Sequence, residues 1–242
     1  MENRKHVRAS SNLAMLEFVA RKLGELNNDV VYLGGCATAL FINDPLSLDV
    51  RPTLDVDCII DVVSLIQYHR FESQLTKKGF KKSMEDDVIC RWHYNDIILD
   101  VMPTNEKVLG FGNRWYQEAL EHAVTHQLTE DISIQSVAAP YFIATKIEAF
   151  KTRGNNDLLM SHDFEDIITV IAGRINIDEE VAETSAELKN HLKKTFQEML
   201  DDDQFELILP GHLNEGPGTM MRVEVVKDRI MRMISMASEN SK

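Results

Sequence analysis

The chain has 242 residues, of which 44% are hydrophobic and 27% are charged, enough to bury one large core or two smaller ones. Its formal net charge of −13 argues against broad, non-specific adhesion to polyanions, because that adhesion needs a basic face. Three cysteines and eight histidines show no zinc-ligand spacing, and no run of about 18 apolar residues predicts a membrane span.

The start of the chain predicts where the protein resides. Residues 1–11 are polar and lack the apolar centre of a secretory signal. We therefore expect a cytoplasmic protein that does not insert in a membrane. In that reducing compartment Cys36, Cys58 and Cys90 are expected to be buried thiols.

The first predicted elements are a helix, a strand and a glycine turn. Apolar residues recur at helical spacing from about residue 10 to residue 27. Residues 29–33 form an apolar strand that ends at Gly34 and Gly35, and the small residues that follow predict a short helix. A glycine pair lets the backbone approach a phosphate group with no Cβ in the way. Taken alone, the pair is also typical of ordinary turns.

The second strand, at residues 54–61, carries two acidic residues, Asp55 and Asp57. Residues at i and i+2 of a strand point to the same side, so the two carboxylates share one face. They repel each other unless a cation lies between them, and oxygen ligands of this kind suit Mg²⁺. A solvated edge strand is the alternative interpretation, but the apolar residues on either side argue against it.

A third acidic residue is expected beside this strand. A helix at residues 64–78 comes first, with Ser64 and Gln67 as a capping box. Two β-rich runs, residues 87–93 and 97–102, then form a hairpin that places Asp100 next to the Asp55 strand. Asp100 is either a carboxylate satisfied by backbone or the third acid of the site, and its neighbourhood favours the second. A short helix at 115–121 and strands at 122–128 and 132–137 follow.

From residue 138 onward the pattern is helical, with helices predicted at residues 140–150, 163–171, 178–200 and 218–235 and a polar break at 154–156. We therefore expect an α+β core over residues 1–137 and a helical region over 138–242 that completes a nucleotide cleft. Methionines near the end are interpreted as a buried helix face rather than an adaptable binding surface; they are Met220, Met221, Met231, Met233 and Met236.

Four charged residues of the helical region form a second candidate group. Lys146 and Arg153 are seven residues apart, so they share a helix face. Solvated helix charges are the plain interpretation, and it suits Lys151, but for Lys146 a role in holding phosphates is favoured. Asp163 and Asp166, three residues apart on the next helix, are expected to order these cations by ion pairing or to contact the nucleotide.

Together these motifs resemble known proteins. The apolar strand, Gly34-Gly35, Asp55-Val56-Asp57 and the later Asp100 resemble the signature of polymerase-beta-like nucleotidyltransferases. Lys146-Ile147-Glu148-Ala149 with Arg153, and Asp163-Phe164-Glu165-Asp166, resemble the nucleotidyl transferase AbiEii/AbiGii toxin family over about residues 28–175. Cys36 departs from the pattern, because many relatives carry Ser or Thr there, and the interval from Gly35 to Asp55 is longer than usual.

The resemblance implies a fold and a set of residue roles. The fold would be a polymerase-beta-like core, with a mixed sheet and flanking helices, followed by a C-terminal helical region. Mg²⁺, as two ions during turnover, and a nucleoside triphosphate (NTP) would be required. Metal binding falls to Asp55, Asp57 and Asp100, and Lys146 joins them as catalytic. Nucleotide contact falls to Gly34, Gly35, Lys146, Arg153, Asp163 and Asp166.

The implied activity is transfer of a nucleoside monophosphate to a hydroxyl of RNA, such as transfer RNA, or of a protein. Family members are toxins of toxin–antitoxin or phage-defence modules, so an antitoxin is an expected partner. Two alternatives stay open: a non-catalytic module that binds nucleotide or antitoxin, and a transferase that modifies a small molecule such as an antibiotic. The presence of all three acids argues against the non-catalytic module.

Overall fold

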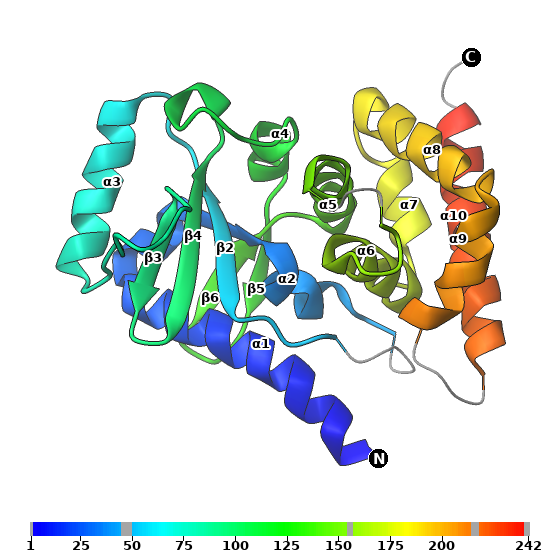
Figure 1. The fold of residues 1–242 in the computed structure, drawn as a ribbon, viewed down its shortest axis with the longest axis horizontal. Helices are drawn as coiled ribbons and strands as arrows, with labels where there is room; N and C mark the ends of the chain where they lie inside the picture. Colours follow the sequence, from blue (N-terminus) through cyan, green and yellow to red (C-terminus); the bar gives the residue numbers. More distant parts are fainter. Residues whose placement is uncertain (1, 45–49, 154–156, 214–217, 240–242) are drawn as a thin grey trace. The chain divides into compact units, whose positions relative to one another are not determined.

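The computed structural model describes residues 2–44, 50–153, 157–213 and 218–239, with backbone alone for 2–10 and 237–239. The chain divides into two compact units, residues 1–40 with 51–138 and residues 41–50 with 139–242 (Figure 1). The architecture is α+β, as the sequence predicts, with one six-stranded mixed sheet. None of the helices described in these ranges combines the length and apolar character needed to cross a membrane.

The sheet of the first unit has the strand order β3-β4-β2-β1-β6-β5. Parallel pairing joins β2 to β4 and β1 to β6, and the remaining neighbours are antiparallel. The strands are β1 Val30–Leu33, β2 Asp55–Ile60, β3 Arg91–Tyr94, β4 Ile97–Pro103, β5 Val124–Gln127 and β6 Ser133–Ser136.

Two helices, α1 Glu2–Leu23 and α3 Leu65–Lys77, supply apolar side chains to the core on one face of the sheet. Val56 and Cys58 of β2 belong to that core, so the alternate residues of β2 point to the other face. The remaining helical elements of this unit are η1 Gly24–Asp29, α2 Gly34–Ala37, η3 Glu106–Val108 and α4 Tyr116–Glu121, and η2 Thr38–Phe41 ends at the first residue of the second unit.

The second unit is helical, and the short segment before residue 45 belongs to it. The backbone amides of Asn43 and Asp44 each donate to the Gly173 carbonyl at 3.0 Å. Arg229 donates to the carbonyls of Ile171 and Ala172 at 2.7 Å, so the end of the helix His162–Gly173 (α6) is capped from two directions. The elements of the second unit are α5 Ala139–Arg153, α6 His162–Gly173, α7 Ile177–Ala182, α8 Ala186–Leu200, α9 Asp203–Ile208, η4 Leu209–His212 and α10 Thr219–Glu239.

Three expected elements differ in the structure. The first helix, expected from about residue 10 to residue 27, is α1 at Glu2–Leu23, and η1 follows it. Residues 178–200 form two helices rather than one, because Ser185 accepts a hydrogen bond from the Leu188 amide at 3.2 Å and starts α8 anew. The strand expected at 87–93 begins only at Arg91, because the Arg91 amide donates to the Val88 carbonyl at 3.1 Å and closes a turn there. The polar break expected at 154–156 lies outside the described residues.

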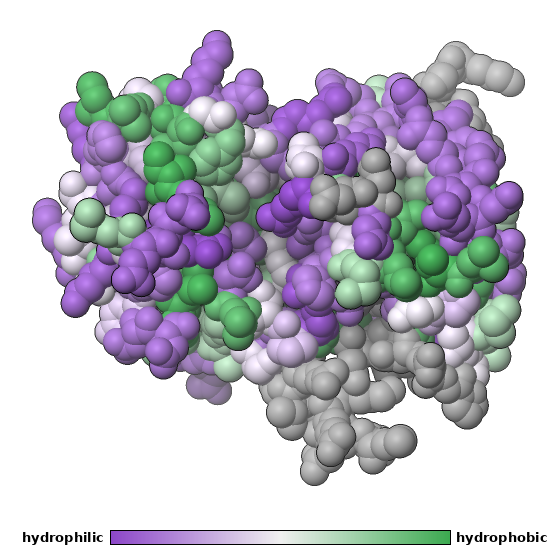
Figure 2. Space-filling model, in the orientation of Figure 1, coloured by the Kyte–Doolittle hydropathy of each residue, from purple (hydrophilic) through white to green (hydrophobic). Residues whose placement is uncertain are grey.

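The prediction of a buried methionine face on the last helix was wrong for three residues. Met220, Met221 and Met231 are 65%, 73% and 52% exposed, whereas Met233 is 1% exposed. Only one side of α10 packs on its own unit, so methionines at other helical angles face outward. Leu207 of α9 is also 79% exposed, and Figure 2 shows apolar groups among hydrophilic ones at the surface near α9.

Candidate functional site

Three carboxylates predicted from the sequence lie on one face of the sheet. Asp55 and Asp57 come from β2, and Asp100 lies beside Asp57 on the parallel neighbour β4. Leu99 and Val101, on either side of Asp100, point into the core together with Val56 and Cys58. Because side chains alternate along both strands, Asp55, Asp57 and Asp100 point away from that core. Asp100 is buried, and the other two are half-buried.

The glycine turn after β1 is pressed against one of these carboxylates. Gly34 has φ of +74°, and a Cβ placed on it would lie 1.9 Å from Asp57 Oδ2 and 2.6 Å from Asp57 Cγ. Leu33, the preceding residue, is the register partner of Asp57. Both the left-handed backbone and the space beside it therefore require glycine at position 34, whereas Gly35 is buried in the first turn of α2.

Asp55 is oriented by a residue just before the strand. The Thr53 hydroxyl lies 2.5 Å from Asp55 Oδ1 and donates to it. A hydroxyl that donates to the carboxylate restricts its rotation. The face that carries Asp55, Asp57 and Asp100, called the acidic face below, thus has an oriented oxygen ligand at the start of β2.

The third acid has a partner that the sequence analysis missed. Arg91 of β3 donates from Nε to Asp100 Oδ1 at 2.9 Å and from a terminal nitrogen to Oδ2 at 2.7 Å. These hydrogen bonds, and then the charges of Asp100 and Asp55, raise the pKa of the Arg91 guanidinium above its ordinary value. The sequence contains a signal for this pair. The two-residue turn at Asn95-Asp96 pairs Tyr94 with Ile97, and the same register places Arg91 opposite Asp100.

The four charged residues expected in the helical region form a compact ion-pair group. Lys146 Nζ lies 3.0 Å from Asp163 Oδ1 and 2.7 Å from Asp166 Oδ2. Arg153 donates to both oxygens of Asp163, at 2.9 and 3.0 Å. Lys146, Asp163 and Asp166 are buried, whereas the Arg153 side chain is 70% exposed. Asp163 and Asp166 therefore form ion pairs, one of the two roles expected for them.

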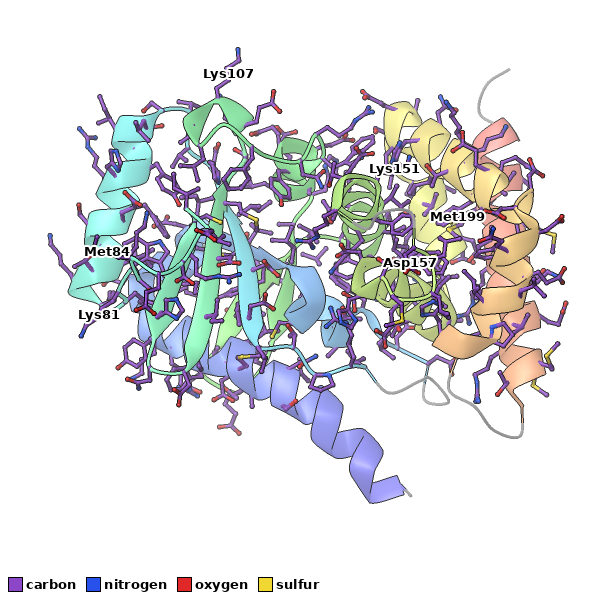
Figure 3. All side chains as sticks on the ribbon, viewed as in Figure 1. Lys81, Met84, Lys107, Lys151, Asp157 and Met199 are labelled. Atoms are coloured by element: carbon purple, nitrogen blue, oxygen red, sulfur yellow. The ribbon has the colours of Figure 1, made fainter. Side chains whose placement is uncertain are left out.

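Two opposing effects set the pKa of Asp163: its burial, and its pairing with the two cations. Burial alone would raise the pKa of Asp163, but the hydrogen bond from Arg153 and the charges of Lys146 and Arg153 outweigh it and lower the pKa to about 2. The carboxylate therefore stays charged at neutral pH. Lys151, expected to be a solvated helix charge, is exposed (Figure 3). Its ammonium group donates to Thr195 Oγ1 at 3.3 Å.

Cys36, next to the glycine turn, faces the protein interior. Its thiol is buried and donates to the Asn12 carbonyl at 3.2 Å. Burial raises the thiol pKa well above its ordinary value, and the charges of Asp57 and Asp55 add to this effect. A buried neutral thiol of this kind is a weak donor, so it offers little to a phosphate.

The predicted residues thus fall into two groups, one in each unit. The acidic face with Gly34 and Gly35 belongs to the first unit, and the Lys146 group belongs to the second. Within the described ranges, no set of three or more His, Cys, Asp or Glu side chains is arranged to hold a metal ion. The engagement of both Asp100 oxygens by Arg91 is consistent with that result.

Comparison with known proteins gives a fold likeness and no family. No family model matches the chain, and no curated protein matches it. Among solved structures, the "Crystal structure of JHP933 from Helicobacter pylori" is similar, with a TM-score of 0.52 and 9% sequence identity over 95% of this chain and 94% of that chain. At this identity the likeness shows a shared fold alone.

Proposed function

We propose that this protein is a Mg²⁺-dependent nucleotidyltransferase with a polymerase-beta-like core. It would transfer a nucleoside monophosphate from an NTP to a hydroxyl of RNA or protein and release pyrophosphate. The observation that carries the proposal is the acidic face, where Asp55, Asp57 and Asp100 project from adjacent strands and Gly34 is pressed against Asp57. The sequence resemblance supports placing it with the AbiEii/AbiGii toxins, as part of a toxin–antitoxin or phage-defence module.

The donor atoms on this face fit Mg²⁺. Asp55 and Asp57 offer carboxylate oxygens, and the Thr53 hydroxyl orients one of them. Protein-bound Mg²⁺ commonly uses one or two carboxylates and completes its shell with water and substrate phosphates. Asp55 and Asp57 would hold the ion, which would supply charge neutralisation for the triphosphate. Asp100 is the next carboxylate along the same face.

Gly34 and Asp57 define where a phosphate would approach. A glycine at this turn leaves the backbone amides uncovered by a side chain, and any Cβ there would displace Asp57. Phosphoryl transfer depends mainly on positioning and on neutralising charge. The turn and the carboxylate are held in contact, so substrate and cation would meet at one place.

The Lys146 group suits a supporting role better than direct contact with phosphates. Lys146 is buried against two carboxylates, and a buried charge depends on such partners. The pairs tie α5 to α6 and hold Arg153 in place. Within this group we therefore assign nucleotide contact to Arg153, the exposed cation, ahead of Lys146.

Incubation with labelled NTPs is the direct test. Each of the four NTPs is supplied with Mg²⁺ and total RNA or cell lysate, and transfer of label to a macromolecule is measured. Wild type should produce labelled product with at least one base, and Asp57→Asn should lower the yield by about 100-fold or more, as removal of one charge-stabilising group does. Asp61→Asn, an exposed acid just beyond the same strand, should keep wild-type activity.

Absence of labelled product with every base would contradict the transferase assignment. The Arg91–Asp100 pair favours one alternative, a module that binds nucleotide without turning it over. In that pair the guanidinium of Arg91 already occupies both oxygens of the third acid. Calorimetry separates the two: tight NTP binding with no transfer in the labelling assay would indicate the non-catalytic module.

A further inference from the structure

Four residues stand in one transverse row across the sheet. Leu33 of β1 pairs with Asp57 of β2, Asp57 pairs with Asp100 of β4, and Asp100 pairs with Arg91 of β3. Neighbouring strands lie about 4.8 Å apart, so partners in register point their side chains to the same face. The row therefore sets two carboxylates side by side and a guanidinium next to the second.

The pairing of Arg91 with Asp100 is strong by its geometry. Both oxygens of the carboxylate accept hydrogen bonds, at 2.9 and 2.7 Å, in the fork arrangement that arginine makes with carboxylates. The Asp100 side chain is 10% exposed and that of Arg91 is 23% exposed, so solvent screens this pair only weakly. The charge of Asp55 also stabilises the charged guanidinium, so Arg91 interacts with a second acid of the same face.

We propose that Arg91 is an internal counter-cation that keeps Mg²⁺ from settling on the acidic face until the nucleotide brings it. This inference rests on the proposed function, since it concerns how the same face is loaded. A guanidinium and a divalent cation on neighbouring oxygens repel each other, which weakens binding of the metal alone. The negative charge of a triphosphate offsets that repulsion, so metal and NTP bind together.

Arg91 is a positioning residue in this scheme, because it acts through Asp100. Its charge, more than its shape, sets the metal affinity. Removing the charge should let the metal bind without nucleotide, whereas keeping a cation at the position should not. A merely structural role would lower thermal stability without changing how much metal the protein needs.

The test is a thermal-shift titration of the full chain with MgCl2, with and without a non-hydrolysable NTP analogue of each base. Wild type should respond to Mg²⁺ with the analogue and barely to Mg²⁺ alone. Arg91→Met should respond clearly to Mg²⁺ alone, at Mg²⁺ concentrations about tenfold lower than wild type needs for the same thermal shift, a change equal to about 1.4 kcal/mol. Arg91→Lys keeps the charge and should behave as wild type. Arg91→Gln, which keeps one amide donor, serves if Arg91→Met fails to fold.

The outcomes separate this inference from the function beneath it. If uncharged variants and wild type share one Mg²⁺ midpoint, while wild type still responds to Mg²⁺ with nucleotide and Asp57→Asn does not, the role of Arg91 is overturned and the proposed function stands. If wild type responds to no combination of Mg²⁺ and nucleotide, the proposed function fails and this inference fails with it.

Discussion

Gly34 is the residue at which backbone conformation and site chemistry depend on each other most directly. Its φ of +74° disfavours any side chain, and a Cβ would also meet Asp57 at 1.9 Å. Gly110 has a similar φ of +81° but nothing within 4 Å of the added atom. The two positions therefore share the backbone strain and differ in the steric clash.

This contrast gives a prediction. Gly110→Ala should lower the free energy of unfolding by about 1–2 kcal/mol, the cost of a left-handed residue with a Cβ. Gly34→Ala should cost about 1–3 kcal/mol more, because Asp57 must move to accommodate the methyl group. Urea unfolding of both variants measures the difference. Equal losses would show that Asp57 yields without cost.

Asp163 should make the stability of the protein depend on pH. Its pKa is lowered to about 2 from an ordinary value of 3.8. A lowered folded-state pKa contributes stability that is present above pH 4 and is lost as the pH falls toward 2. Between pH 5 and pH 2, wild type should therefore lose about 2 kcal/mol more than Asp163→Asn does.

Urea unfolding at several acidic pH values measures this loss. Asp203→Asn, an exposed acid of α9, is the matched control and should keep the wild-type dependence on pH. Parallel curves for wild type and Asp163→Asn would mean that the ion pairs with Lys146 and Arg153 do not hold in solution.

At the residue scale, the sequence located the acidic residues but not their partners. Alternation along a strand was enough to place Asp55 and Asp57 on one face, and the hairpin was enough to bring Asp100 beside them. Burial of Lys146 was not predictable, because a spacing of seven residues defines a shared helix face without saying which way it points. The register of the hairpin would have placed Arg91 opposite Asp100, but this pair was not predicted.

At the element scale, α10 shows why identical residue types differ in consequence. Met233 is 1% exposed and Met221 is 73% exposed on the same helix. Met233→Gln should lower the free energy of unfolding by about 2 kcal/mol, because a polar amide enters the core. Met221→Gln should change it by less than about 0.5 kcal/mol, as is usual for surface substitutions.

Thermal unfolding of the two variants checks this prediction. A large loss for Met221→Gln would favour the buried methionine face that the sequence pattern indicated. Periodicity alone could not decide the matter, because α10 has methionines at helical angles on both its buried and its exposed side. Helix starts set by one residue, such as Ser185 before α8, were also hard to foresee within a continuous helical pattern.

At the scale of the whole molecule, the sequence predicted an α+β protein with helices in its second half, and the structure has that character. It did not predict that residues 41–50 belong with the helical unit. Asn43 and Asp44 join that unit through backbone amides that donate to Gly173. The Asn43 side chain adds hydrogen bonds with the Ile175 amide and the Asn176 side chain. These partners are more than 130 residues away in the chain, so local composition and spacing do not predict the association.

The distribution of cysteines has a practical consequence at this scale. All three lie in the first unit and are buried, and burial raises the pKa of Cys90 to about 12. Alkylating reagents attack the thiolate, so labelling must wait until that unit opens. The rate of alkylation therefore measures how fast the sheet unfolds. It does not report on unfolding of the helical unit, because that unit contains no cysteine.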